Sequence, residues 1–201
     1  MRSFIRLVAD SDVAAIAALY RPIVEATAIS FETEPPTPEG MRRRIGETLP
    51  SYPWLVYDVA GQVTGYAYAT RHRVRAAYQW SVDTSIYVHP EFRRHGIGRG
   101  LYASLFGILA AQGYFNAYAG IALPNPASVA LHESVGFKPL GVYRNVGYKL
   151  GAWHDVGWWQ LVLKQSELSP HRPLDLRAIQ ARRDWEALLA RGISGIRVNV
   201  A

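Results

Sequence analysis

The chain has 201 residues, of which 49% are hydrophobic, enough to bury the core of one domain. It contains no cysteine, so disulfides, thiolate nucleophiles and zinc–thiolate sites are excluded. Its apolar stretches are far shorter than the roughly 18 residues of a membrane span, and Arg2 and Arg6 precede no apolar signal segment. We therefore expect a cytoplasmic protein with no membrane partner. A metal would need His, Asp and Glu as ligands, and we expect none.

The formal charge of +6 comes almost wholly from arginine, since lysine occurs only at Lys138, Lys149 and Lys164. Arginine favours bidentate contacts with phosphate and carboxylate. The arginines are dispersed rather than gathered in one basic run, so a phosphate-rich small molecule explains the charge as well as nucleic acid does. We do not expect a nucleic-acid partner.

The first elements in chain order are a strand and two helices. Residues 4–8 predict a short strand, and Asp10 or Ser11 can cap the helix that follows. Pro38 suits the first turn of a second helix, which runs to about Leu49. Segments rich in aromatic and β-branched residues then predict a β-meander at residues 54–59, 63–72 and 80–88.

The periodicity changes after the meander. Apolar residues spaced three and four apart predict a helix over residues 98–111, and Gly113 suits its end. After a strand at residues 115–121, Asn125 caps a helix with Pro126 in its first position, ending near Gly136. Strands at residues 141–148 and 157–163 complete an α/β domain with a mixed sheet.

The last part of the chain has a different character. Residues 166–175 are polar and carry two prolines, which indicates a linker. A helix is predicted over residues 174–191, with one apolar side and many arginines elsewhere. We expect it to pack on the domain or across a dimer, with binding to nucleic acid or membrane as the alternative. The predicted division is a domain at residues 1–165 and a linker with a C-terminal amphipathic helical extension at residues 166–201.

The most informative segment lies at residues 86–102, where a strand enters a basic, glycine-rich turn that opens a helix. Such a turn leaves backbone N–H groups pointing at an anion, and Gly96 and Gly98 permit close approach. Positive charge comes from Arg93, Arg94 and Arg99. A diphosphate suits this turn, although glycines also mark ordinary strand-to-helix connections. The spacing fits neither the P-loop nor the dinucleotide fingerprint.

In this segment the sequence resembles the GNAT superfamily of N-acetyltransferases. The pattern Arg93-x-x-Gly96-x-Gly98 after Ile86-Tyr87-Val88 resembles its acetyl-CoA pyrophosphate motif, and residues 125–137 resemble its second CoA-contacting helix. More narrowly, residues 3–165 are similar to phosphinothricin and methionine sulfone or sulfoximine acetyltransferases. The matching segments are residues 31–35, 73–78, 123–128, 131–133 and 147–157.

The resemblance implies a GNAT fold, a mostly antiparallel, twisted sheet flanked by helices, with splayed fourth and fifth strands that admit pantetheine. It implies acetyl-CoA as cosubstrate, a small anionic amine as substrate, and a homodimer. The residues it assigns to acetyl-CoA binding are Ile86, Tyr87, Val88, Arg93, Arg94, His95, Gly96, Ile97, Gly98, Arg99, Asn125 and Ser128.

Asp83 is the candidate proton acceptor. Alternation along the strand places Asp83, Ser85 and Tyr87 on one face, just before the basic turn. A carboxylate there can take the ammonium proton directly or through water. The resembled subfamily usually carries glutamate at this position, so the shorter aspartate favours a relaying water. The alternative is that Asp83 only pairs with Arg73 or Arg75.

His132 is the second catalytic candidate. It lies four residues after Ser128, on the same helix face. Many members of the superfamily have a tyrosine here that protonates the leaving thiolate. Histidine titrates near neutrality, so it can serve as that acid or help to deprotonate the amine. A structural histidine is the alternative.

The predicted substrate pocket combines basic and aromatic residues. Arg73 and Arg75 are expected to alternate along one strand beside Tyr78 and to clamp a carboxylate, which is the role implied by the resemblance. Arginines on a solvated edge strand are the alternative. Phe31 and Glu32 would form the opposite wall, with Glu32 attracting the ammonium group, and Ser85 completes the set.

Other functions stay open on the sequence alone. Within enzymes, the amine could belong to a polyamine or to a protein N-terminus, although paired arginines would repel a polyamine. Outside enzymes, the chain could be a non-catalytic acyl-CoA sensor or a nucleic-acid-binding module that uses its basic tail.

Overall fold

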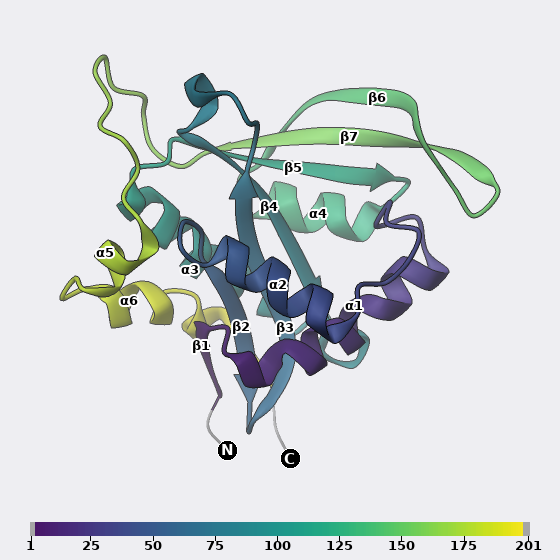
Figure 1. Ribbon diagram of the computed structural model, residues 1–201, viewed down its shortest axis with the longest axis horizontal. Coiled ribbons are helices and arrows are strands. Elements are labelled where there is room, and N and C mark those ends of the chain that lie inside the picture. The colour runs from purple at the N-terminus through teal and green to yellow at the C-terminus, as the bar shows by residue number, and fades with distance from the viewer. Residues whose placement is uncertain (1–2, 199–201) are drawn as a thin grey trace.

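The computed structural model describes residues 3–198, and these form one sheet with helices on both faces (Figure 1). The strand order is β1-β2-β3-β4-β5-β7-β6, and every neighbouring pair is antiparallel except β4 and β5. The strands are β1 (Ser3–Leu7), β2 (Trp54–Val59), β3 (Gln62–Arg71), β4 (Ser81–Val88), β5 (Asn116–Leu123), β6 (Lys138–Lys149) and β7 (Ala152–Val162).

The sheet separates the core into two layers, each covered by helices. Helices α1 and α2 cover one face of the sheet, where Ile16, Met41 and Trp54 are buried. Helices α3 and α4 lie on the other face, where Leu101, Leu105 and neighbouring side chains pack against the strands. The bounds are α1 (Val13–Ala26), α2 (Pro38–Thr48), α3 (Ile97–Gln112), α4 (Pro126–Ser134), α5 (Leu176–Gln180) and α6 (Trp185–Ala190).

Pro38, Gly113 and Asn125 occupy the helix ends at which they were predicted, and Thr37 adds a cap that was not predicted. The Thr37 side chain accepts a hydrogen bond from the backbone of Gly40 at the start of α2, and Pro38 occupies the first turn. Gly113 ends α3 with a φ of 103°. The side chain of Asn125 accepts from the backbone N–H of Ser128, so Asn125 caps α4 as expected.

The start of α1 differs from the prediction that Asp10 or Ser11 caps it. Residues Asp10–Asp12 form a 3-10 turn, and α1 begins only at Val13. The carboxylate of Asp12 accepts hydrogen bonds from the Arg6 guanidinium and from the backbone N–H of Ala9. Asp12 is thus the residue that precedes α1, and its side chain pairs with Arg6 of β1 instead of capping the helix.

The last two strands are longer than predicted. Expected at residues 141–148 and 157–163, they extend to Lys149 and back to Ala152, because Leu150 and Gly151 adopt positive φ angles of 52° and 80°. This tight turn joins the strands directly, so residues between the two predicted segments pair instead of forming a loop. The resulting β6–β7 hairpin curves beyond the rest of the sheet in Figure 1.

The single helix predicted over residues 174–191 is wrong, because two short helices, α5 and α6, take its place. The Arg182 side chain donates twice to the Asp184 carboxylate in the intervening turn. Leu176, Ile179 and Leu189 are buried against the α3 side of the core. The segment packs on the domain, which was one of the two expected placements.

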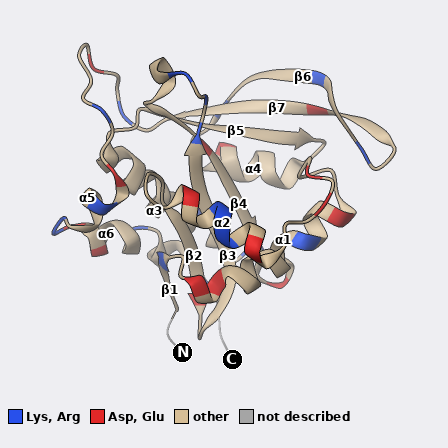
Figure 2. Ribbon diagram, viewed as in Figure 1, with Lys and Arg blue, Asp and Glu red and all other residues tan. Residues whose placement is uncertain are grey.

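Charge is distributed over many elements. Figure 2 shows lysine and arginine on helices, on β6 and in the tail, interleaved with acidic residues. In the part of the chain that the structure describes, no helix is both long enough and apolar enough to cross a membrane.

Candidate active site

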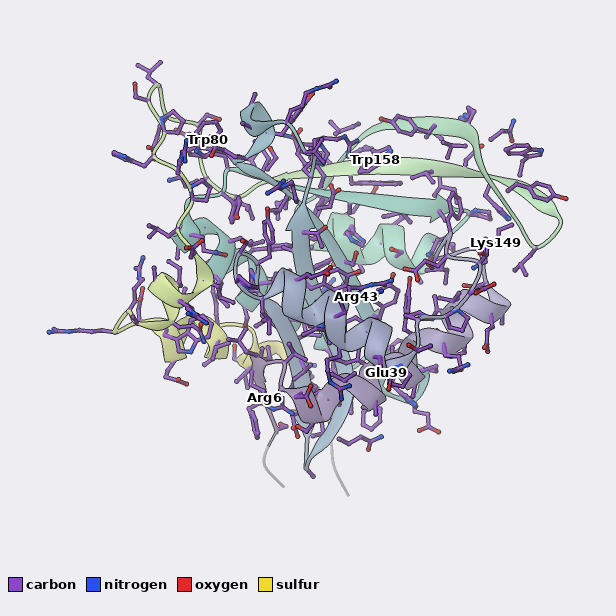
Figure 3. All side chains as sticks on the ribbon, in the orientation of Figure 1. Arg6, Glu39, Arg43, Trp80, Lys149 and Trp158 are labelled. Atoms are coloured by element: carbon purple, nitrogen blue, oxygen red, sulfur yellow. The ribbon has the colours of Figure 1, made fainter. Side chains whose placement is uncertain are left out.

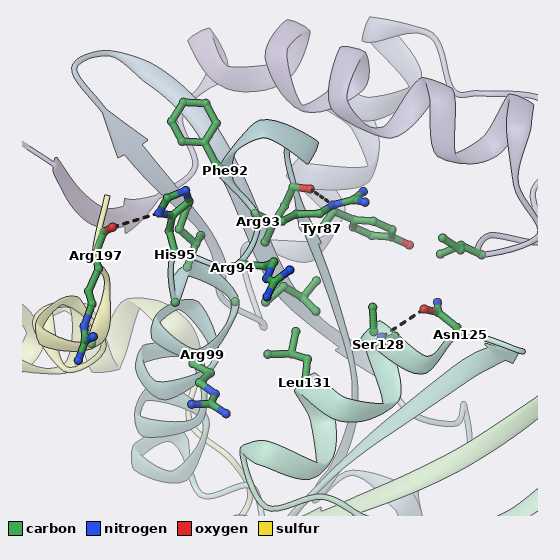
Figure 4. A pocket seen from close by; sticks show the side chains of 18 of the residues that line it. Tyr87, Phe92, Arg93, Arg94, His95, Arg99, Asn125, Ser128, Leu131 and Arg197 are labelled. Carbon is green, nitrogen blue, oxygen red and sulfur yellow. Dashed lines mark hydrogen bonds between the residues drawn. The ribbon is translucent and has the colours of Figure 1, made fainter. Parts of the chain in front are cut away.

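A cavity of about 810 Å³ lies between the end of β4, the turn that follows it and α4. Every residue predicted to contact acetyl-CoA lines this cavity, so the structure brings that whole set together. In Figure 4, Arg94 lies centrally, with His95 and Arg197 on one side and Ser128 and Asn125 on the other. The remaining lining residues are Ile23, Ile29, Phe92, Ala127, Leu131 and Gly195.

The turn has the backbone geometry of an anion cradle. Arg94 and Gly96 adopt left-handed φ angles of 68° and 84°, and Gly96 precedes the first residue of α3. N–H groups at the first turn of a helix have no partner within that helix and carry partial positive charge. A Cβ on Gly98 would lie 3.0 Å from Leu131 of α4, so glycine lets the two helices approach here. Backbone N–H groups at the start of α3 and the arginines that line the cavity would suit a phosphorylated ligand.

The C-terminal segment contributes to the wall of this cavity, which the sequence analysis did not anticipate. The backbone N–H of Arg197 donates to the carbonyl of His95 over 2.8 Å, and His95 Nδ1 donates to the carbonyl of Arg197 over 3.1 Å. A Cβ on Gly96 would collide with the carbonyl of Gly195. No recognised motif marks this segment, so its place could be found only from the folded chain.

Strands β4 and β5 part next to the cavity. They pair in parallel only from Ser81 to Asp83, with Tyr118 as the partner of Asp83. Beyond that pair a smaller cavity of about 60 Å³ opens between Thr84–Tyr87 and Gly120–Ala122. Ser128 and His132 of α4 also line it, so a ligand that entered this gap would contact β4, β5 and α4.

His132 is buried, with both ring nitrogens engaged. Nδ1 donates to the carbonyl of Ser128 over 2.7 Å, because a carbonyl can only accept. Nε2 therefore accepts from the Tyr102 hydroxyl over 2.8 Å. Burial lowers the pKa of His132, while the hydrogen bond to Ser128 opposes that shift. Burial thus favours the neutral imidazole, and the two hydrogen bonds define its tautomer.

Asp83 points to the opposite face of the sheet and pairs with His72, a residue that the sequence analysis placed only at a strand end. His72 Nδ1 lies 2.6 Å from Asp83 Oδ1, and Arg73 Nη1 lies 4.0 Å from Asp83 Oδ2. Burial raises the pKa of the Asp83 carboxyl, while His72 and Arg73 act against that shift. The register of β3 with β4 could have suggested the pair. Arg71 lies opposite Val82, so His72 and Asp83, each one residue further along its chain, lie on the same face of the sheet.

The predicted clamp of two arginines on one strand is corrected by the structure. Strand β3 ends at Arg71, so Arg73 and Arg75 do not alternate along it. The Arg73 guanidinium lies 5.5 Å from the Trp158 ring and donates to the carbonyl of His72, while Arg75 begins the 3-10 turn that contains Tyr78. The run of basic residues here forms a loop beside Asp83 rather than a strand.

The predicted opposite wall is held in place by ion pairing and packing. The Arg44 guanidinium donates to both carboxylate oxygens of Glu32, and the Tyr20 hydroxyl donates to Oε1. Phe31 packs so closely on the β6–β7 hairpin that a Cβ on Gly147 would collide with its ring. The Glu32 carboxylate is therefore already partnered by a cation from α2.

Lys149 anchors the loop that carries Phe31 and Glu32. Its Nζ donates to the backbone carbonyls of Val24 and Ser30, over 2.6 and 2.7 Å. Figure 3 places Lys149 where the β6–β7 hairpin meets the end of α1. The hairpin thus fixes the position of the loop beside the site.

Comparison with known proteins defines the family. A family model described as an acetyltransferase (GNAT) domain matches residues 5–158. The chain is 40% identical to a phosphinothricin N-acetyltransferase of Streptomyces viridochromogenes, over 85% of this chain and 92% of that protein. It is 33% identical to an L-methionine sulfoximine/L-methionine sulfone acetyltransferase of Salmonella typhimurium, over 80% and 95%.

A solved structure agrees with these relatives. The crystal structure of a GNAT superfamily phosphinothricin acetyltransferase from Sinorhizobium meliloti, in complex with acetyl-CoA, matches with a TM-score of 0.80 at 34% identity, over 85% of this chain and 94% of that one. The chain belongs to the GNAT family of N-acetyltransferases. Within that family its sequence groups with the phosphinothricin and methionine sulfoximine acetyltransferases, so the predicted fold and family are confirmed.

Proposed function

We propose that this enzyme transfers an acetyl group from acetyl-CoA to the α-amine of a small amino acid or analogue of the phosphinothricin or methionine sulfoximine type. The parting of β4 and β5 carries the proposal, because it adjoins the basic, glycine-rich turn after β4 and begins directly after Asp83. The relatives named for these substrates and the neighbour bound to acetyl-CoA support the same assignment. Because charged acetyl-CoA does not cross a bilayer unaided, we place the reaction in the cytoplasm.

In the proposed reaction, the amine nitrogen attacks the thioester carbonyl carbon and forms the C–N bond. The C–S bond breaks and the thiolate leaves, while the ammonium proton passes to Asp83 directly or through water. The leaving thiolate takes up a proton, so that CoA departs as the thiol. His132, which lines the smaller cavity, is proposed as the second proton-transfer group for this step. Arg73, Arg75 and Tyr78 are proposed to hold the acidic end of the substrate, with Ser85, Phe31 and Glu32 completing the pocket.

The test is free-thiol release from acetyl-CoA with methionine sulfone, methionine sulfoximine, phosphinothricin, spermidine and a short peptide, with mass spectrometry of the acetylated products. We expect turnover with the first three, because each carries an acidic group that Arg73 and Arg75 could bind. The several positive charges of spermidine would be repelled by the same arginines. Turnover with spermidine or the peptide alone would contradict the substrate class. Tight acetyl-CoA binding without release on any amine would instead support a sensor.

We further propose that the enzyme is a homodimer joined through the β6–β7 hairpin. Apolar side chains more than 50% exposed gather there, and patches of this kind on a folded chain are typical of interfaces. They are Leu140, Tyr143, Tyr148, Leu150, Trp153 and Val162.

The expected result is twice the mass of one chain in light scattering for the wild type. The double variant Leu140→Glu/Tyr143→Glu should shift the protein to the mass of one chain, because each carboxylate would be buried at the interface. Leu168→Glu is the matched control, since Leu168 is fully exposed in the linker. A wild type of single-chain mass at micromolar concentration would overturn the proposal.

A further inference from the structure

The contact between His72 and Asp83 is short and well sheltered. His72 follows the last residue of β3, and its Nδ1 lies 2.6 Å from Oδ1 of Asp83 on β4. The side chains are 12% and 29% exposed. Because Oδ1 of a carboxylate accepts, Nδ1 carries the proton and donates it. The pair is therefore a directed hydrogen bond at the end of a strand, partly shielded from water.

Three aromatic residues fix the orientation of the His72 ring. It stacks on Tyr118 of β5, with ring centroids 4.3 Å apart and planes 19° apart. Trp158 of β7 and Tyr78 of the 3-10 turn meet it edge-on, at 6.3 and 6.0 Å. Since these neighbours come from three elements, the imidazole has little freedom to turn away from Asp83.

The pair lies where the sheet opens. Asp83 and Tyr118 form the last parallel pair of β4 and β5, and the gap proposed for the thioester begins with Thr84. Oδ1 of Asp83 is engaged by His72. Oδ2 lies 4.0 Å from Arg73 Nη1, which is too long for a hydrogen bond. Oδ2 is therefore the oxygen suited to receive a proton from an incoming amine.

We propose that His72 is a positioning residue for the proton transfer, holding Asp83 ionised and oriented so that Oδ2 accepts the amine proton. The inference rests on the proposed acetyl transfer. When the C–N bond forms and the C–S bond breaks, the proton lost by the nitrogen binds Oδ2, while the Nδ1–H bond to Oδ1 stays intact. His72 thus supplies a fixed donor and undergoes no covalent change.

The charged and titratable groups around the carboxylate decide the direction of the pH effect. They are His72 itself, Arg73 after β3, Tyr78 of the 3-10 turn and Tyr118 of β5, while Trp158 carries no charge. Burial raises the pKa of Asp83, and the hydrogen bond from His72 opposes this more than Arg73 does. Loss of the His72 donor therefore raises the pKa of Asp83 further, and activity needs a higher pH to appear.

Two substitutions separate donation from packing. His72→Phe keeps a ring that can stack on Tyr118 but removes the donor. His72→Asn loses the ring, while its side-chain amide can donate in place of Nδ1. The measurement is kcat/KM for the amine from pH 5.5 to 9, whose acidic limb reports the free enzyme.

For His72→Phe we expect the acidic limb to move up by about one pH unit, with kcat/KM about tenfold lower below the limb and close to wild type above it. His72→Asn should keep the limb of the wild type. A loss that is equal at every pH, or a His72→Phe enzyme like wild type beside an impaired His72→Asn enzyme, would assign His72 to packing and overturn the proposal.

A measurement without substrate keeps this test independent of the proposed function. Carbon-13 NMR titration of the Asp83 carboxyl should give a higher pKa in His72→Phe than in wild type, with circular dichroism confirming that the variant is folded. An unchanged pKa would refute the role of His72 even in an active enzyme. Absence of wild-type turnover on every amine would refute the acetyl transfer. The NMR titration would still test whether His72 lowers the pKa of Asp83.

Discussion

Replacing Asp83 with asparagine is expected to lower kcat/KM for the amine by about 10²- to 10⁴-fold, the usual contribution of a general base. Asparagine has nearly the same shape, and its amide oxygen can still accept from His72 Nδ1, which lies 2.6 Å from Oδ1 in the wild type. It cannot take up a proton in the reaction. The loss should therefore appear in catalysis while the fold and the cavity remain unchanged.

The measurement is the initial rate of thiol release at saturating acetyl-CoA, together with calorimetric binding of CoA to the same variant. CoA affinity serves as the internal control, because Asp83 does not line the larger cavity. A rate within about threefold of wild type would exclude Asp83 as the proton acceptor. Loss of CoA binding would show that the substitution had disturbed the strand instead.

Gly192→Ala is expected to weaken CoA binding by about tenfold or more and to destabilise the fold by about 1–3 kcal/mol, the usual cost of overpacking. A Cβ at this position would collide with the backbone carbonyl of Gly100 in α3. That backbone cannot move aside without shifting the helix, so the tail must move away. The contacts of Gly195 and Arg197 with the glycine-rich turn would then be lost.

Gly195→Ala is the matched control, because a Cβ there would meet no atom within 4 Å. Calorimetry with CoA and thermal unfolding compare the two variants directly. If Gly192→Ala binds CoA like Gly195→Ala while its tail becomes open to proteolysis, the tail serves only stability. If Gly192→Ala loses both CoA affinity and melting temperature, the result would support a role of the tail in forming the wall of the CoA cavity.

The features predicted correctly are those encoded over short stretches of sequence. Asn125 caps α4, Pro38 opens α2 and Gly113 closes α3, because each acts through backbone groups within a few residues. The residues of the glycine-rich turn after β4 also lie together on one cavity, since they are contiguous in the sequence, while their role in phosphate binding stays a prediction. Periodicity and capping therefore located most helices and strands, and the turn located the candidate cavity.

The features that were missed depend on contacts between distant segments. The pairing of His72 with Asp83 requires the register of β3 on β4, and the place of Arg197 requires the docking of the tail on α3. Arg73 and Arg75 were misplaced because the end of β3 at Arg71 carries no proline or glycine signal. Tertiary packing decides these positions, and composition alone does not reveal it.

The parting of β4 and β5 beyond Asp83 has a consequence for the lifetime of the enzyme. It leaves an interior seam in which strand N–H and C=O groups face one another without closing the ladder, and such groups need partners. The amide groups of a pantetheine arm lying there would supply hydrogen-bond partners to both strands for as long as the ligand is bound. At a hundredfold excess over its Kd, a bound ligand adds about 2.7 kcal/mol to the free energy of unfolding. The supply of acetyl-CoA would thus govern how long the protein survives as well as how fast it works.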